Sequence, residues 1–157
     1  MKPSRKILIF GSLILFSVLL AFVFQKPKEP VGQREEIKIK ETKIYIELAD
    51  TPLEKTKGLS GRNSLGKSEG MLFIFAQNTQ PSFWMKDMNF GIDIIWIDDG
   101  KIIQIDKNVP NQPPGTPDSS LPRYTPKEPI DYVLEVNAGF SDKNNFEVGD
   151  PVDLSSL

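Results

Sequence analysis

The sequence contains no histidine and no cysteine, and this limits the chemistry that its side chains can perform. A Ser-His-Asp or Cys-His nucleophile system, a disulfide framework and nearly every zinc or copper site require one of these two residue types. Any chemistry must therefore come from carboxylates, lysines, arginines, tyrosines, hydroxyls or a bound molecule.

Asp93 is the acidic residue with the most unusual sequence environment. It stands in the otherwise apolar segment 92–97, so its carboxylate is expected at the end of a strand or partly buried. A buried carboxylate needs a cation or several donors, because its desolvation is otherwise costly. Lys86 and Arg62 are the available cations. They either line a ligand-binding cleft with Asp93 and the Trp84 ring, or form a structural ion pair that closes one end of the fold.

Glu135 and Asn137 form a second polar pair, on the same side of a predicted strand as Val133. Polar residues on the open face of an antiparallel strand are usually solvated. If that face instead meets the cleft, Glu135 and Asp93 would be paired carboxylates, one of them with a raised pKa as general acid.

Two acidic segments are weak candidates for calcium. Asp98-Asp99-Gly100 is typical of a turn, and the segment 142–146 lacks the glycine and the terminal glutamate that a calcium loop requires. No metal site and no cofactor are therefore assigned.

The elements that must position these residues are mostly strands, because apolar residues alternate with a period of two or form short buried runs. Strands are expected at 37–39, 44–48, 71–75, 82–86, 92–98, 101–106 and 130–136, with a last turn at 149–150.

Other signals predict the connections. Thr51-Pro52-Leu53-Glu54 is a capping box that begins a helix at 52–57, and Gly58 ends it. Asp98-Asp99-Gly100 predicts a hairpin. Seven of the 13 prolines fall between residues 110 and 129, which predicts a long irregular loop.

Many short strands with one short helix predict a mainly β fold, either an antiparallel β-sandwich or a jelly-roll-like barrel. The segments ADTPLEKTKGLSGR, GMLFIF, SFWMKDMNFGIDIIWID and YVLEVNAGF, followed by VGD, resemble domain-of-unknown-function family 192 from about residue 44 to 152. The resemblance implies a compact jelly-roll-like β-sandwich with a short helix, often exported or membrane-anchored. The resemblance does not point to any particular activity.

The N-terminus predicts a membrane anchor. Residues 7–24 form an uncharged stretch of 18 residues, long enough for a helix to cross most of a hydrocarbon core. Three basic residues precede it, which places the N-terminus in the cytoplasm. We expect a transmembrane signal anchor at 1–25, a stalk at 26–36 and an extracytoplasmic β domain at 37–157. The protein would then be a single-pass protein of the cytoplasmic membrane, or a secreted protein if the signal were cleaved.

The net charge and the motifs exclude some classes of function but do not identify a single one. After residue 25 there are 16 basic and 21 acidic residues, a net charge of −5, so no nucleic-acid partner is expected. The favoured interpretation is a binding or accessory module for a small molecule or an envelope polymer, without catalysis. A carboxylate-based hydrolase of envelope carbohydrate is one alternative, and a protein-interaction module using the proline-rich loop is another.

Overall fold

A computed structural model of the chain describes residues 35–157. The predicted anchor at 1–25 and nearly all of the predicted stalk lie outside these residues. Within residues 35–157, no helix is both long and apolar enough to span a bilayer.

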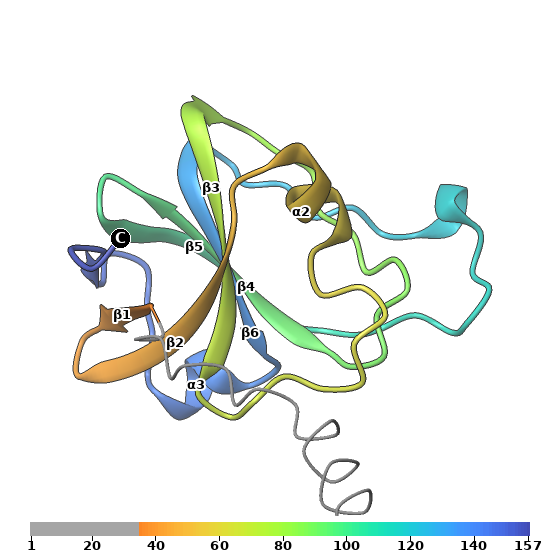
Figure 1. Cartoon of the computed structure of the whole chain (residues 1–157), viewed down its shortest axis with the longest axis horizontal. Helices are drawn as coiled ribbons and strands as arrows, with labels where there is room; N and C mark the ends of the chain where they lie inside the picture. Colours follow the sequence, from red (N-terminus) through yellow and green to blue (C-terminus); the bar gives the residue numbers. More distant parts are fainter. Residues whose placement is uncertain (1–34) are drawn as a thin grey trace, which may run out of the picture. The chain divides into compact units, whose positions relative to one another are not determined.

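The described chain folds into one curled sheet of seven strands with few and short helices, so the mainly β prediction is confirmed (Figure 1). The sheet order is β5-β4-β6-β3-β2-β1-β7. The strands are β1 (Glu36–Ile39), β2 (Thr42–Ala49), β3 (Glu69–Thr79), β4 (Ile92–Asp98), β5 (Lys101–Val109), β6 (Ile130–Asn137) and β7 (Val152–Asp153). The helices are α2 (Pro52–Lys57), α3 (Phe140–Lys143) and the 3-10 turn η1 (Asp118–Ser120).

The sheet is mixed, whereas an antiparallel fold was expected. Every neighbouring pair is antiparallel except β2 and β3, which run parallel. Parallel neighbours need a crossover connection of about a dozen residues or more. The segment between Ala49 and Glu69, which contains α2, provides that crossover.

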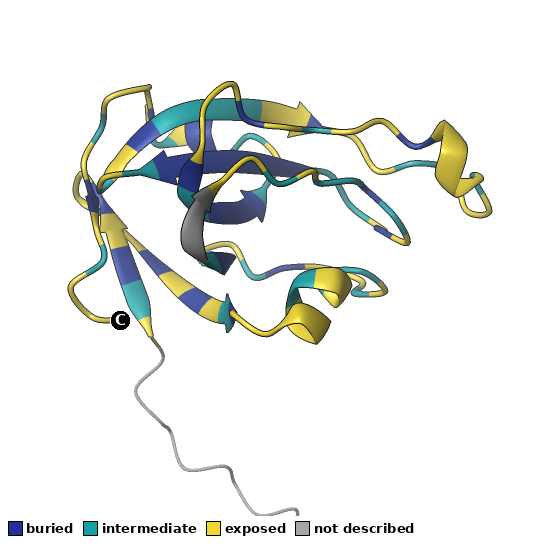
Figure 2. Ribbon diagram, turned by 90° about the horizontal axis from the view of Figure 1, so that it is seen from above, coloured by how far each residue is buried: buried dark blue, intermediate teal, exposed yellow. Residues whose placement is uncertain are grey.

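The two ends of the sheet meet, so the single sheet curls into a barrel-like shape instead of forming a two-sheet sandwich (Figure 2). The amide of Gly149 donates to the carbonyl of Ile102 over 2.8 Å, and the amide of Val152 donates to Gly100 over the same distance. Lys101 and Pro151 form an isolated bridge between these bonds. These contacts join the β5 edge to the segment that enters β7.

Both faces of strand β4 are covered, as its apolar sequence predicted: the six residues from Ile92 to Ile97 are all buried. Ile95 and Ile97 belong to the cluster inside the curl, together with Leu72 and Leu134. The opposite face carries a second cluster, which includes Phe73, Met85, Ile94, Trp96 and Val133.

The predicted helix is confirmed in its bounds and in its cap. Thr51 Oγ1 accepts from the Glu54 amide over 3.3 Å, and Glu54 Oε2 accepts from the Thr51 amide over 3.0 Å. None of the helix residues is buried, so α2 is held mainly by its cap and lies on the outside of the domain. Its last turn borders a pocket.

Two local predictions need correction. The segment 82–86 is not a strand, because only Phe83 pairs, in an isolated antiparallel bridge to Tyr124. A second helix, α3, was missed because it has only four residues. It follows Gly139, whose φ of 77° is readily available only to glycine among common residues.

Candidate functional site

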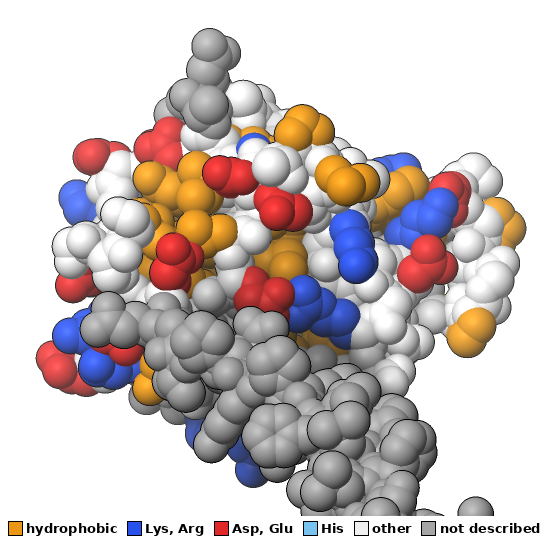
Figure 3. Space-filling view, viewed as in Figure 1, with side chains coloured by type: hydrophobic (Ala, Val, Ile, Leu, Met, Phe, Trp, Pro, Cys, Tyr) orange, Lys and Arg blue, Asp and Glu red, His pale blue; other side chains and the backbone are white. Residues whose placement is uncertain are grey.

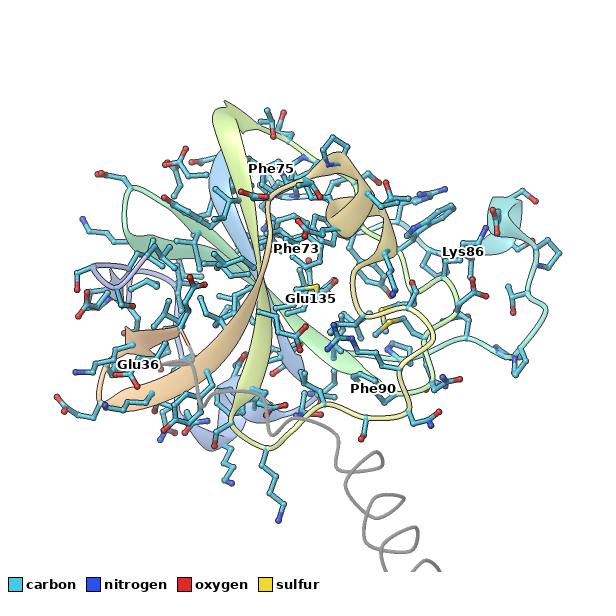
Figure 4. The ribbon with its side chains drawn as sticks, viewed as in Figure 1. Glu36, Phe73, Phe75, Lys86, Phe90 and Glu135 are labelled. Carbon is cyan, nitrogen blue, oxygen red and sulfur yellow. The ribbon has the colours of Figure 1, made fainter. Side chains whose placement is uncertain are left out.

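A pocket of about 310 Å³, here called the aromatic pocket, lies between α2 and the sheet. Its walls are four aromatic rings, and it is bordered by the end of α2, Met88, Arg123 and Glu135. The rings are those of Phe73, Phe75, Phe83 and Trp84. Figure 4 shows Phe75, Phe73 and Glu135 following one another from beside α2 toward the middle of the fold.

The walls are held by edge-to-face packing. The ring centroids of Phe73 and Phe83 are 4.9 Å apart at 84°, and those of Phe83 and Trp96 are 5.5 Å apart at 88°. The indole nitrogen of Trp96 donates to Asp106 Oδ2 over 2.7 Å. Phe83 is therefore held between Phe73 of β3 and Trp96 of β4. Because its rings are fixed in this way, the pocket is largely preformed.

Glu135 is the polar group at the sheet side of the pocket. In the register, it lies between Met71 of β3 and Ile94 of β4, so its side chain projects from the face that carries the second cluster. It is 5% exposed, and among the described residues it has no hydrogen-bond or ion-pair partner. Burial raises its pKa from 4.5 to about 8. The carboxyl is therefore mostly protonated at pH 7 and can donate one O–H bond.

Two cations stand at the rim of the pocket on aromatic rings. The Arg123 guanidinium lies 3.8 Å from the centroid of the Trp84 ring, and Lys55 Nζ lies 4.9 Å from the centroid of the Phe75 ring. Basic and apolar side chains lie next to one another over the α2 half of this face, with acidic side chains among them (Figure 3). The arrangement combines an apolar interior, one neutral donor and a basic entrance.

Asp93 serves a different purpose from the one its sequence suggested. It is fully buried and accepts three backbone bonds, from the amides of Asn108 (2.8 Å), Gly139 (3.0 Å) and Ser141 (2.8 Å). Neither Lys86 nor Arg62 contacts it, so the expected ion pair is wrong. The carboxylate joins the end of β5 to the start of α3.

The other predicted site residues are dispersed. Arg62 makes a bidentate pair with Glu47 at 2.6 and 2.7 Å. Lys86 pairs with Asp118 over 2.6 Å, and its Nζ is also 5.3 Å from the Trp84 ring. The side-chain Nδ2 of Asn137 donates to the backbone carbonyls of Leu65 and Gly66.

The two predicted carboxylates do not meet. Glu135 is opposite Ile94 in the ladder, whereas Asp93 is opposite Val136. Because neighbouring residues in a strand project to opposite faces, Glu135 and Asp93 lie on opposite sides of the sheet. The structure brings only Trp84 and Glu135 of the predicted residues together at the aromatic pocket.

Comparison with known proteins decides the family. Residues 35–154 match the sequence profile of DUF192, which is described as an uncharacterized ACR. The chain is a member of the DUF192 family. No significant match is found among curated proteins.

Two crystal structures share the fold of this DUF192 domain. A protein of unknown function from Novosphingobium aromaticivorans has a TM-score of 0.67 and 28% identity, and the match covers 75% of this chain and 83% of that one. A Sinorhizobium meliloti protein, provisionally described as a transcription regulator, has a TM-score of 0.65 and 29% identity, with 73% and 84% covered.

Of the residues that border the pocket of the DUF192 domain, sequence reasoning predicted only Trp84 and Glu135, and those that it missed include Lys55, Phe75 and Arg123. Lys55 and Arg123 are ordinary surface cations by sequence. Phe75 is the last residue of an apolar segment that predicts a strand, and by sequence it looks like an ordinary core residue. No signal in the sequence marks any of the three, because the pocket forms where α2, β3 and the long loop converge.

Proposed function

We propose that the DUF192 domain is a binding module that takes a small molecule, or a short segment of envelope polymer, into the aromatic pocket. The observation that carries this is Glu135: its carboxyl is 5% exposed, has no hydrogen-bond or ion-pair partner among the described residues, and borders a preformed apolar pocket. Small-molecule sites are typically apolar concavities with a few placed polar groups. An unpaired buried polar group costs stability, and a ligand acceptor at this position would satisfy the Glu135 hydroxyl.

The alternatives receive less support. A hydrolase of envelope carbohydrate usually needs two carboxyl groups flanking one bond, and Glu135 faces the pocket without Asp93. A protein-interaction module would use the long loop, but Arg123 and Tyr124 of that loop contact Trp84 and Phe83 of the domain itself.

We also propose that residues 1–25 anchor the protein in the cytoplasmic membrane, with the N-terminus inside and the domain outside. The support is the uncharged stretch of 18 residues after three basic residues. Protease added to spheroplasts is expected to degrade the domain. Its full protection, while a cytoplasmic marker is also protected, would contradict this location.

Binding is tested with N-phenyl-1-naphthylamine, a neutral apolar fluorophore, added to the full-length protein in lipid nanodiscs, with empty nanodiscs as the blank. Fluorescence enhancement that saturates is expected. Trp84→Ala should weaken the affinity at least tenfold, or about 1.4 kcal/mol, since it removes one wall of the pocket.

Tyr45→Ala is the matched control, because Tyr45 is an aromatic residue on β2 that is 39% exposed and does not border the pocket. It should leave the affinity unchanged. An absence of saturable binding, or equal losses in the two variants, would contradict the proposed pocket function.

A further inference from the structure

We infer that the ligand of the aromatic pocket is an amphipathic monoanion, with its apolar part against the aromatic walls and its anionic group between Arg123 and Lys55 at the rim. This inference rests on the proposed binding function and adds the chemical class of the ligand.

The charges that border the pocket favour an anion. Three of the bordering residues are basic, namely Lys55, Lys57 and Arg123, and Glu135 is the acidic one. Glu135 is buried at the sheet side and mostly neutral at pH 7 because burial raises its pKa to about 8. A ligand therefore meets positive charge at the entrance and no compensating carboxylate in the interior.

The two rim cations keep their hydrogen-bond donors available. The Arg123 guanidinium carbon lies 3.8 Å from the centroid of the Trp84 ring, and a guanidinium placed on an aromatic ring still has N–H groups that can bind a carboxylate or phosphate edge. Lys55 rests on the Phe75 ring at 4.9 Å. Among the described residues, neither cation is held in an ion pair.

Neighbouring cations show the contrast. Lys86 also approaches the Trp84 ring, but its ammonium is paired with Asp118 over 2.6 Å. Arg62 is paired with both carboxylate oxygens of Glu47. Lys86 and Arg62 are thus neutralised, whereas Arg123 and Lys55 at the rim have no acidic partner within residues 35–157 as far as these are described.

The test compares three ligands that share one apolar chain: octanoate, 1-octanol and octylamine. Their affinities for the full-length protein are measured by isothermal titration calorimetry at pH 7. Octanoate is expected to bind at least tenfold more tightly than the other two. Arg123→Gln should remove most of that preference, because it should weaken the binding of octanoate much more than the binding of 1-octanol.

Lys67→Gln is the matched control, since Lys67 is an exposed cation that does not border the pocket. It should change none of the three affinities. Two sources of such an anion, a lipid-derived acid and a soluble aromatic acid, are distinguished by comparing octanoate with 2-naphthoate, and tight binding of either one supports the inference.

Equal affinities for octanoate and 1-octanol, or a preference for octylamine, would overturn the anion assignment while leaving the pocket function intact. Equal losses for octanoate and 1-octanol in Arg123→Gln would also overturn it. If neither N-phenyl-1-naphthylamine nor any of the four ligands bound, the proposed function itself would fail, and the inference with it.

Discussion

Replacing Glu135 by Gln is expected to raise the free energy of unfolding at pH 8 by several kcal/mol. In the folded chain, burial raises the pKa of Glu135 to about 8, from an ordinary value of 4.5. Between these two pH values the unfolded chain has lost the proton and the folded chain has kept it. The unfolded state then binds fewer protons, so stability falls as pH rises.

The pH profile separates this effect from a simple packing change. Glu135 should lower the stability of the wild-type protein by about 1.4 kcal/mol per pH unit between pH 4.5 and 8, and this contribution should level off above that range. Gln has nearly the same shape and does not titrate. The curves of the wild type and Glu135→Gln should therefore meet near pH 4 and diverge as pH rises.

The measurement is urea unfolding of the full-length protein, followed by tryptophan fluorescence at several pH values. Glu41→Gln, at an exposed turn between β1 and β2, is the control and should follow the wild-type curve within about 0.5 kcal/mol. Parallel curves for the wild type and Glu135→Gln would show that Glu135 is not buried in the uncharged form.

Because Glu135 lowers the stability of the fold at neutral and alkaline pH, its contribution to packing does not explain why this residue is present. Buried polar groups are normally paired, and the exceptions in natural proteins occur chiefly at functional sites. If Glu135→Gln proves more stable but binds the pocket ligand less well, stability and binding make opposite demands on this position.

Much of the fold was predictable because local signals agreed with tertiary structure. The alternation of apolar and polar residues in β1 and β2 predicted which side chains point into the core, including Ile37 and Ile44, which are both buried. The hairpin between β4 and β5 has Asp99 at φ 45° and Gly100 at φ 66°, the two positive angles that a type I′ turn requires. Turn and cap chemistry depends on adjacent residues, so sequence reveals it.

The site was less predictable, because its geometry depends on contacts distant in sequence. The period of two correctly placed Glu135 on one face with Val133, but only the packing of α2 and the segment 81–90 over that face makes it buried. Asp93 illustrates a different limit. Sequence reasoning sought a cationic side chain for it, whereas its partners are backbone amides, which nearly every residue possesses.

Asp93→Ala is expected to lower the free energy of unfolding by about 3 kcal/mol, because it leaves three amides without their acceptor. The bond from Ser141 is buried and the other two are partly buried, and each buried unsatisfied donor costs about 1–3 kcal/mol. Asp93→Asn should lose less, about 1–3 kcal/mol. Oδ1 accepts from Asn108 and Gly139 while Oδ2 accepts from Ser141, so an asparagine oxygen can keep two of the three bonds. Urea unfolding at pH 7 measures both losses, and Asp50→Ala, at an exposed aspartate, is the control.

Lys86→Gln distinguishes this amide-binding role from the ion pair that the sequence suggested. A buried pair with Asp93 would make the loss of Lys86 cost about 3–5 kcal/mol. The observed partner is Asp118, and the two side chains are 40% and 54% exposed, so the loss should stay within about 1 kcal/mol. A large effect of Lys86→Gln together with a small effect of Asp93→Ala would contradict the structural role of Asp93. The opposite result would establish that the carboxylate supports the fold from the face of the sheet opposite Glu135, and octanoate affinity should then survive Asp93→Asn wherever the variant remains folded.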